Sequence, residues 1–483
     1  MPRVSILVLA IVLFLCASEA AAGGFSISIL GGRRTGMLAN LAAPDDLTAL
    51  FHNPAGLADQ PGWRAHLSTS VTFLGTDFRM KGLDPERYPD LNPAGCGGAG
   101  AKPCPWPLDD KGYYRQKISP EKYFGVLPYL GLSRDLDFLG ARDVVVSLAV
   151  TAPNLYGAFL PESAPTAYNF ISGYFAVIST TLGAGWKVNR HLSLGASVSY
   201  NYMRLAYAQR ISLADMLRGK SPTDQDKAIA DAAQALIGDL RIDYTGVDHG
   251  AGWNLGALVR PTDWLAFGFS YNGATSARFV GGLSFQAVGD PSLDVRGLAA
   301  GLDRKLPRRL AVEMPIPHSI QAGMNLRPAA WAEIGFDARF WLYNLYTRQV
   351  IDPMYDPAEP GQPVLTTEDM SRDKHYGLSY ELALGALFRP WPAQPGFKVM
   401  TGVAFDKSPV PDESFSLDNP SMNQIVATAG VRWQFALHWR MAASYMFDYY
   451  LPRDITTSQA SPPVNVKGRG IGQMPRLEVE VLY

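Results

Sequence analysis

The sequence has few charged residues and, beyond its N-terminus, no long hydrophobic run. Asp, Glu, Lys and Arg make up 18% of its 483 residues, compared with about 25% in soluble domains. The net charge of −1 gives no electrostatic reason to expect nucleic acid as a partner. No later window holds about 18 uninterrupted apolar residues, so the mature chain has no candidate membrane helix. Any residence in a membrane must therefore be as a β-barrel.

The first 22 residues have the pattern of a cleaved secretory signal. Arg3 precedes an apolar run from Val4 to Cys16, and small residues follow this run. The run is shorter than the ~20 residues that a transmembrane helix needs. A lipoprotein signal at Cys16 is disfavoured because bulky Leu15 stands where a small residue is expected. We therefore assign residues 1–22 to a signal peptide and expect an exported protein.

Cysteine is scarce, with three residues in the whole chain. Cys16 would leave with the signal, so Cys96 and Cys104 remain, in the stretch CGGAGAKPC. An even pair in an exported protein predicts a disulfide. A metal site is the weaker interpretation, because no histidine or third cysteine lies nearby. We expect no metal ion and no cofactor.

What the sequence has instead is a repeated alternation with a period of two. From Leu265 to Asn272, bulky apolar residues at every second position alternate with alanine, glycine, serine and asparagine. The same pattern recurs in RHLSLGASVSYNY, WAEIGFDARFWL, HYGLSYELALGALF and NQIVATAGVRWQF. It predicts β-strands whose two faces differ. A soluble β-sandwich also alternates, but its polar face usually carries Lys and Glu. The small, Gly-rich polar face here favours a barrel whose large residues face lipid.

Connections between these segments alternate short and long, as they do between the periplasmic turns and external loops of outer-membrane barrels. Short breaks fall near 134–143, 188–191, 260–263, 327–330, 389–396 and 436–439, and long polar segments near 81–121, 154–168, 212–241, 287–307, 351–373, 409–421 and 452–471. The segments between them predict an all-β fold, a transmembrane antiparallel β-barrel of about 14 strands over residues 61–483. The chain ends on aromatic Tyr483, as bacterial barrel proteins commonly do.

Two regions depart from the strand pattern. The loop at 212–241 contains a segment that predicts a short amphipathic external helix, with Ser221 as its N-cap and Leu236 on its apolar stripe. Its apolar residues either form a first groove for a ligand or pack on neighbouring loops. Residues 23–60 precede the first strand and are too long for a linker and too apolar to be simply disordered. We expect them to form an N-terminal hatch, or plug, inside the lumen.

The predicted hatch contains the tripeptide Asn53-Pro54-Ala55, and GVAFDKSPVPDESFSLDNPSMNQ lies near the C-terminus. Both stretches resemble the FadL-type outer-membrane transporters of long-chain fatty acids and other hydrophobic compounds. GAGWKVNRHLSLGASVSYNYMR and GWNLGALVRPTDW are similar to the middle strands of that family. The resemblance implies a fourteen-stranded barrel with an N-terminal hatch, embedded in outer-membrane lipid. Departures are the long first external loop with its cysteine pair and the two arginines of GGRRTG.

The resemblance suggests two places where a path for substrate could open. Asn53, Pro54 and Ala55 form either a rigid turn or a latch whose movement opens the hatch. In the third strand, Pro153 cannot donate a ladder hydrogen bond, and Gly157 follows soon after. FadL-type proteins have a kink in this strand that opens a gap in the wall. Alternatively, Pro153 only ends the strand at its external rim.

Three arginines are candidates for contact with a substrate. Arg204 matches a basic residue of the family's fifth strand that can face a bound carboxylate. Strict alternation, however, puts it on the outward parity of Tyr200, unless a bulge reverses its direction. Arg339 and Arg278 have lumen parity. Each either contacts ligand or pairs with neighbouring acids such as Asp337.

These features predict a monomeric passive transporter of hydrophobic small molecules across the bacterial outer membrane. Long-chain fatty acids are the favoured substrate, and aromatic or aliphatic hydrocarbons are the alternative, because an apolar pocket discriminates shape weakly. An outer-membrane lipid enzyme is a further class, but no histidine sits in a Ser-His-Asp or metal-ligand spacing. We therefore expect no catalytic residues. A general porin is disfavoured by the hatch.

Overall fold

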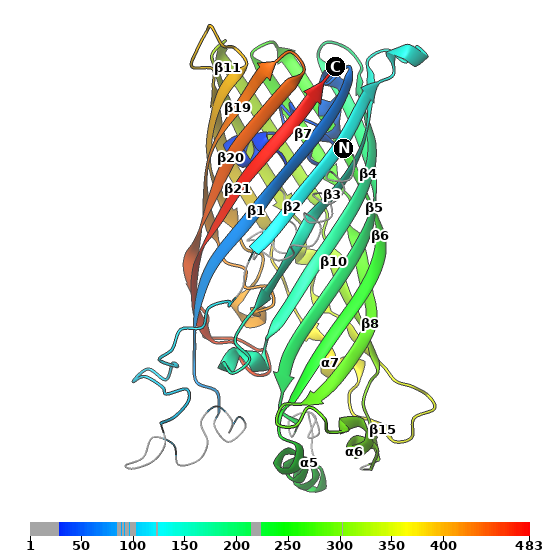
Figure 1. The fold of residues 1–483 in the computed structure, drawn as a ribbon, viewed down its shortest axis with the longest axis vertical. Helices are drawn as coiled ribbons and strands as arrows, with labels where there is room; N and C mark the ends of the chain where they lie inside the picture. Colours follow the sequence, from blue (N-terminus) through cyan, green and yellow to red (C-terminus); the bar gives the residue numbers. More distant parts are fainter. Residues whose placement is uncertain are drawn as a thin grey trace, which may run out of the picture.

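The computed structural model describes residues 29–84, 88, 91, 96, 103–121, 124–213, 224–301 and 303–483. The predicted signal peptide and Ser221 lie outside these residues. Within them, fourteen antiparallel strands close into a barrel, because the last strand pairs with the first (Figure 1). The predicted fold class is confirmed.

Each strand of the wall pairs with the next strand along the chain. The seventh wall strand is interrupted and consists of β7 and β8, and the eighth likewise consists of β10 and β11. The ninth, β12, is followed by β14 (Ile351–Met354), which pairs with β10. The wall strands are β1 (Trp63–Met80), β2 (Phe124–Asp135), β3 (Val144–Phe159), β4 (Ser172–Lys187), β5 (Leu192–Ile211), β6 (Leu240–Thr262), β7 (Leu265–Asn272), β8 (Thr275–Ala287), β10 (Arg309–Ile316), β11 (Ser319–Ala329), β12 (Ala332–Trp341), β17 (Ser379–Phe388), β18 (Phe397–Lys407), β19 (Gln424–Ala436), β20 (Trp439–Asp454) and β21 (Val466–Leu482).

Helices and short strand pairs occupy the connections and the N-terminal segment. The short strands are β9 (Arg304–Lys305) with β15 (Gln362–Pro363), and β13 (Arg348–Gln349) with β16 (Arg372–Asp373). No helix in the described part of the chain has the length and hydropathy needed to cross a membrane. The helices are α2 (Gly32–Met37), α3 (Ala49–His52), η1 (Pro54–Asp59), η2 (Asp137–Leu139), η3 (Pro165–Tyr168), α5 (Asp224–Ile237), α6 (Val295–Gly301), η4 (Tyr343–Leu345), α7 (Thr367–Met370) and η5 (Asp412–Ser414).

Short connections lie at one end of the barrel, with the C-terminus, and long connections at the other (Figure 1). We call these the short-turn end and the long-loop end. The predicted alternation of connections agrees with this arrangement, with one correction. The segment at 154–168 is not wholly a loop, because β3 continues past Pro153 to Phe159 while paired with β4.

The two faces of the strands are divided as the alternation predicts. Phe269 on β7 is 50% exposed on the outside of the barrel. Its neighbours face inward: the Ser270 hydroxyl bonds to Asn254, and Gly268 lies against the carbonyl of Leu41. The large apolar residues of this strand therefore form the outer surface, where lipid would contact them.

The predicted helix in the loop at 212–241 is present as α5. Ala233 and Ile237 pack in a cluster with Leu213 of the same connection and with Val295 of the connection after β8. Leu236, which we expected on the apolar stripe, is 74% exposed instead. The packed face is therefore rotated from the predicted one and is covered by other loops.

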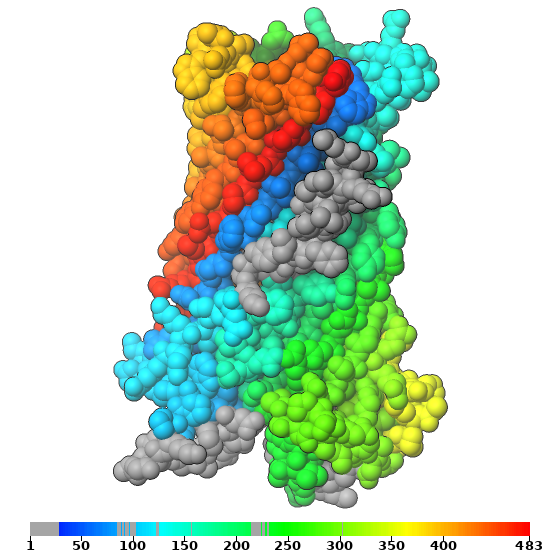
Figure 2. Space-filling model, in the orientation of Figure 1, coloured from blue at the N-terminus to red at the C-terminus, as the bar shows by residue number. Residues whose placement is uncertain are grey.

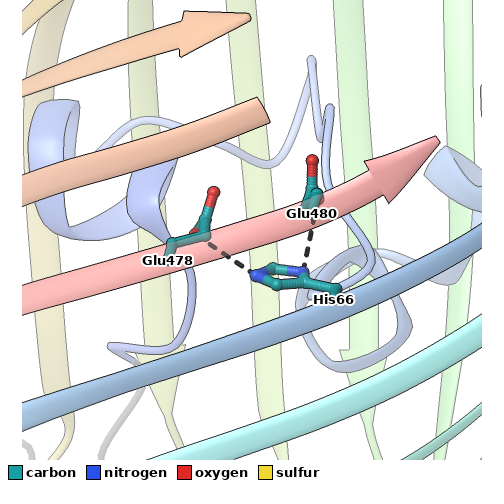
Figure 3. Close-up of side chains that lie close together, drawn as sticks. All are labelled: His66, Glu478 and Glu480. Atoms are coloured by element: carbon teal, nitrogen blue, oxygen red, sulfur yellow. Dashed lines mark ion pairs between the residues drawn. The ribbon is translucent and has the colours of Figure 1, made fainter. Parts of the chain in front are cut away.

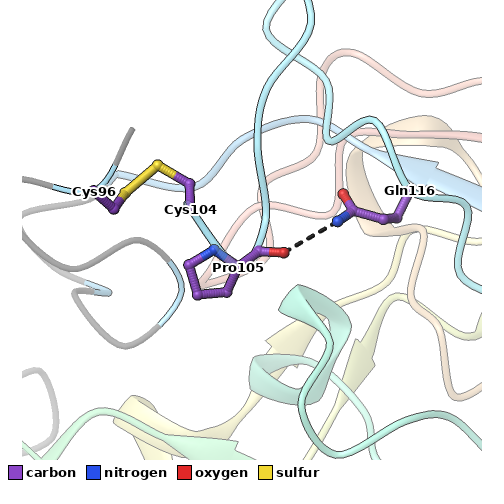
Figure 4. Close-up of a disulfide and its surroundings, with 4 residues drawn as sticks. All are labelled: Cys96, Cys104, Pro105 and Gln116. Carbon is purple, nitrogen blue, oxygen red and sulfur yellow. Dashed lines mark hydrogen bonds between the residues drawn. A yellow bond between two sulfur atoms is a disulfide. The ribbon is translucent and has the colours of Figure 1, made fainter. Parts of the chain in front are cut away.

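A disulfide joins Cys96 to Cys104 in the first long connection, with Cα atoms 4.9 Å apart (Figure 4). Beside it, the Gln116 side chain donates a hydrogen bond to the carbonyl of Pro105, at 3.0 Å. The Trp106 indole donates to the carbonyl of Ser163 in the next connection, at 2.9 Å. These bonds hold the loop independently of the barrel ladder.

We expect the variant C96S/C104S to insert as a normal barrel, because the cross-link closes only a short loop outside the wall. Its loss should cost on the order of 2–3 kcal/mol of loop stability. Heat-modifiable migration in electrophoresis should match that of the wild type. Thiol labelling of wild-type protein purified without reductant should find neither cysteine free, and two reactive thiols would contradict the pairing.

Candidate functional site

Residues 29–60, here called the lumen segment, lie inside the barrel at the short-turn end, where Figure 1 shows them in blue. The backbone of this segment approaches the wall very closely. A side chain added at Gly385 on β17 would meet the carbonyl oxygen of Met37 at 1.8 Å. Glycine at this inward position therefore leaves room for the backbone that fills the lumen.

Asn53 fixes the corner at which the lumen segment enters η1. Its Oδ1 accepts from the N–H of Ala55 at 3.2 Å, and its Nδ2 donates to the carbonyl of Leu41 at 2.8 Å. The same Nδ2 donates to the carbonyl of Ala257 on β6 at 3.2 Å. Pro54 takes the first position of η1, where its missing N–H has no helical partner to lose. The predicted tripeptide therefore ties two parts of the lumen segment to β6.

The two arginines of GGRRTG pair with carboxylates of the barrel wall. Arg33 lies 3.1 Å from Glu333 on β12 and 3.3 Å from Asp45 of the lumen segment. Arg34 forms an ion pair with Glu381 on β17. Both guanidinium groups are buried. Because a buried charge is tolerated only when it is paired, the lumen segment and the wall depend on each other.

Arg339, predicted as a possible ligand contact, belongs to the same network. It is fully buried, with Nη1 2.7 Å from Glu381 and Nη2 2.9 Å from Asp337. The same Nη2 donates to the side-chain oxygen of Asn40 at 2.5 Å. The geometry supports the ion-pair interpretation of this residue.

A second group of ion pairs joins the lumen segment to β19 and β21. Arg432 lies 2.5 Å from Asp45, 2.9 Å from Asp46 and 3.3 Å from Glu478. Arg476 on β21 donates to the carbonyl of Ile29 at 2.6 Å. The short-turn half of the lumen is thus filled by buried ion pairs between the lumen segment and the wall. We call this part of the lumen the charged floor.

His66 on β1 is completely buried in this floor, between Glu478 and Glu480 (Figure 3). Its Nε2 lies 3.4 Å from Glu478, and its Nδ1 lies 3.4 Å from Glu480. These three are the group of residues in the described part of the chain that could hold a metal ion. A metal ion takes one ring nitrogen, however, and here the two nitrogens face different carboxylates. The arrangement suits an imidazole bridging two carboxylates, and Glu478 also accepts from the N–H of Gly32 at 2.5 Å.

Toward the long-loop end, the inward positions of the strands become large and apolar. On β5, inward Ser197 and Asn201 are followed by Met203, and on β8 Thr275 is followed by Phe279. This change could not be predicted from the sequence, because the alternation continues while the inward face changes from small polar to large apolar residues. We call these residues the apolar lining: Phe175, Val177, Met203, Tyr244, Phe279, Leu283, Val312, Met314, Trp341 and Tyr343.

Lys374 lies beside the apolar lining. It was not among the predicted site residues, because a lysine in a polar loop is expected to be exposed to solvent. It is only 6% exposed, and its Nζ lies 6.0 Å from the centre of the Tyr376 ring. Tyr376 packs on Tyr346, with ring centres 5.2 Å apart. Burial lowers the pKa of Lys374, and nearby Asp418 partly offsets this effect. The hydroxyl of Ser414 donates to the Lys374 carbonyl at 2.6 Å, which fixes the loop.

The family described as "Outer membrane protein transport protein (OMPP1/FadL/TodX)" matches residues 143–467. The chain belongs to this family.

Curated relatives of this FadL/TodX family member have similar descriptions. It is 25% identical over 273 residues to the long-chain fatty acid transport protein of Salmonella typhi. It is 23% identical over 272 residues to the protein of the same name in Escherichia coli K12. These matches cover 53% of this chain and 55% and 56% of the two relatives. The chain therefore spans about half the length of the curated relatives it matches.

Two solved structures resemble the fold of this family member. A Pseudomonas aeruginosa FadL homologue has a TM-score of 0.74 at 16% identity, covering 95% of this chain and 99% of that one. The Pseudomonas putida toluene transporter TodX has a TM-score of 0.65 at 14% identity, with the same coverage. At these identities the likeness concerns the fold alone.

Two of the predicted arginines of this FadL/TodX family member face away from the lumen. Arg204 is exposed on the outer face of β5, 5.3 Å from the centre of the Tyr174 ring. The register of β5 with both neighbours is continuous, so no bulge turns it inward. Arg278, which we expected to have lumen parity, also points outward and lies 2.8 Å from Asp352. Neither residue is placed to contact a ligand in the lumen.

Pro153 and Gly157 lie within β3, in a part of the wall with irregular pairing. The β3–β4 register shifts between Thr151 and Asn154, so Ala152 and Pro153 form a bulge. The ladder between β2 and β3 extends only to Thr151. A side chain at Gly157 would meet the carbonyl of Gly173 at 2.2 Å, so glycine allows close approach to β4.

We expect Arg432→Met to loosen the lumen segment, because it leaves Asp45, Asp46 and Glu478 without a shared cation. Breaking a buried ion pair costs about 3–5 kcal/mol. Conductance in planar bilayers should rise, while the barrel stays heat-modifiable. The exposed Arg204→Gln is the matched control and should leave conductance unchanged. Wild-type conductance of the Arg432 variant would show that the ion pairs do not hold the segment.

Proposed function

We propose that this protein is a passive, monomeric carrier of hydrophobic small molecules across the bacterial outer membrane. The observation that supports this most is the division of the lumen. The apolar lining at the long-loop end gives an apolar solute a favourable environment, and the charged floor below it excludes such a solute. Membership of the outer membrane transport family supports the same function. The long-loop end faces the exterior, and the lumen segment acts as a hatch.

A fatty acid is the substrate class that the lining supports best. A long acyl chain suits the apolar lining, and its carboxylate needs a cation at one end. Lys374 is a buried cation beside the lining, with the Tyr376 ring next to it. Aromatic or aliphatic hydrocarbons are the second candidate, since they need the lining alone. The long-chain fatty acid transport proteins and the toluene transporter named above represent both classes.

A lateral exit through the wall at β3 fits the structure better than passage through the lumen segment. The axial path is filled by a buried segment whose arginines and aspartates pair with the wall. At β3, in contrast, the ladder to β2 stops at Thr151, and the bulge contains Pro153. A hydrophobic solute that leaves the lining here reaches lipid without crossing the charged floor.

We expect Lys374→Met to weaken the retention of labelled oleate by purified protein about tenfold or more. A charge-assisted hydrogen bond contributes on the order of 1.5–3 kcal/mol. Retention of labelled toluene should not change, because toluene has no carboxylate. Lys305→Met is the matched control, since Lys305 also lies over a tyrosine ring, 5.9 Å from that of Tyr355. Equal loss of both ligands would argue against a carboxylate contact.

The same cation gives the oleate complex a pH dependence. Because burial lowers the pKa of Lys374, its ammonium group should lose its charge at a lower pH than that of a surface lysine. Retention of oleate should therefore fall as the pH rises through this lowered pKa, while retention of toluene stays constant. An oleate profile that is unchanged in Lys374→Met would rule out this residue as the titrating group.

Removing the bulge tests the lateral route. Deleting Ala152 and replacing Pro153 with threonine should restore a regular β3 ladder. We expect transport of oleate in whole cells to be abolished while the purified variant still binds it. Pro475→Thr is the matched control, because Pro475 lies in β21 opposite Tyr445 in a continuous register. Full transport through the repaired wall would show that the lateral route is wrong.

A further inference from the structure

A pocket of about 330 Å³ lies at the long-loop ends of β1, β20 and β21. Asp77 and Arg79 of β1 and Lys467 and Arg469 of β21 line it. On β1, the first two share the outward parity of Phe73, so they point away from the lumen. Figure 2 shows this face, with β1 in blue beside β21 in red and the cyan part of the first external loop beyond their lower ends. The pocket thus opens on the outer surface of the barrel.

The pocket begins where the lipid-facing apolar surface ends. On β21, the exposed residues Leu477 and Ile471 are followed toward the long-loop end by Arg469 and then Lys467. Two residues of a tilted strand advance by about 5 Å along the membrane normal. Arg469 therefore lies about one headgroup layer beyond the last apolar residue of the strand. This is the depth at which lipid headgroups contact a membrane protein.

Cations outnumber carboxylates in the lining of the pocket, and of these cations Arg79 also pairs with Asp109 and Arg453 with Asp412 outside it. Asp77 faces two of these cations, with Arg469 at 3.6 Å and Lys117 at 4.0 Å. Lys467 lies 3.1 Å from Asp454. The Arg469 side chain is 62% exposed, so its donors remain accessible to an anion from outside. The charged lining consists of the cations Arg79, Lys117, Arg453, Lys467 and Arg469 and the acids Asp77 and Asp454.

The first external loop forms one side of this pocket. Arg79 Nε donates to the carbonyl of Tyr114 at 3.2 Å, and Lys467 Nζ lies 4.9 Å from the centre of the Tyr113 ring. Lys117 comes from the same loop. This is the long loop with the disulfide, which sequence analysis identified as a departure from the family. The loop therefore helps to shape a charged pocket at the membrane surface.

We propose that this pocket binds the phosphorylated headgroup of an outer-leaflet glycolipid, whose acyl chains lie on the apolar surface below it. Phosphate oxygens accept charge-assisted hydrogen bonds from arginine and lysine, and basic pockets at the membrane surface bind anionic headgroups. A phosphate with attached acyl chains matches both the cations and the adjoining surface of Phe73 and Ile471. The proposal rests on the orientation given under the proposed function, with the long loops outside.

The test measures the binding of purified lipid A to the detergent-solubilised full-length protein by native mass spectrometry. We expect K467Q/R469Q to bind lipid A about tenfold more weakly than the wild type, because two cations at the membrane surface are lost. The single variant K117Q changes only a loop residue outside the ladder and should also weaken binding. R204Q/R309Q removes two exposed cations elsewhere on the outside and should bind like the wild type.

The ligands used distinguish the sources of the anion. Dephosphorylated lipid A should bind the wild type no better than it binds K467Q/R469Q. Inorganic phosphate or oleate that binds as tightly as lipid A would overturn the proposal in favour of a free-anion site. Equal binding of lipid A to wild type, K117Q and K467Q/R469Q would also overturn it. Oleate transport in K117Q should be unchanged, so failure here is distinguishable from failure of the transport function.

Discussion

The closed hydrogen-bond ladder is the constraint on which the rest of the molecule depends. Hydrocarbon offers no partners to backbone N–H and C=O groups, so a wall of strands in a membrane must close on itself. Here β1 pairs with β2 on one side and with β21 on the other. Closure fixes the parity of every strand, because successive side chains point to opposite faces. Apolar residues therefore collect outside, and each inward charge must find its partner within the lumen.

The inward charges explain why the lumen segment and the wall are one structure. Glu333, Glu381 and Glu478 would be unpaired carboxylates without the arginines that contact them. Arg33 and Arg34 bring two of these cations from the lumen segment itself. An axial opening would have to break such pairs together and hydrate each charge again. This cost is the reason that we propose a path for solute from the apolar lining rather than through the charged floor.

The strand number, the short turns and the parity within regular strands could be predicted because a period of two is a local property of the sequence, whereas Arg278 was misplaced because the break between β7 and β8 reverses the parity. The outward direction of Arg204 follows from the same rule. The ion pairs could not be predicted, since Arg34 and Glu381 are 347 residues apart and only the barrel register joins them. The apolar lining was missed because Met203 and Phe279 have the parity of small polar residues earlier in their strands. Lys374 was missed because the packing of Tyr376 on Tyr346, which is far from it in the sequence, leaves no local signal of burial.

Two interruptions of the ladder differ in a way that supports β3 as the lateral route that we propose. Pairing of β6 with the seventh wall strand stops after Val247 and resumes at Asn254. Residues of that strand bridge this interruption: the Thr275 hydroxyl donates to the Ala251 carbonyl at 2.9 Å, and the N–H of Gly273 donates to the Trp253 carbonyl at 3.0 Å. At β3, the Thr151 hydroxyl donates to the Pro128 carbonyl at 2.8 Å, and beyond the bulge the N–H of Glu121 donates to the Phe159 carbonyl at 2.8 Å. Pro153 lies between these two bonds and has no N–H to offer, so the strand cannot repair its own ladder by a small shift. The β6 interruption is therefore a bend in a wall that stays hydrogen-bonded. At β3, in contrast, Pro153 lacks the N–H that a regular ladder would need.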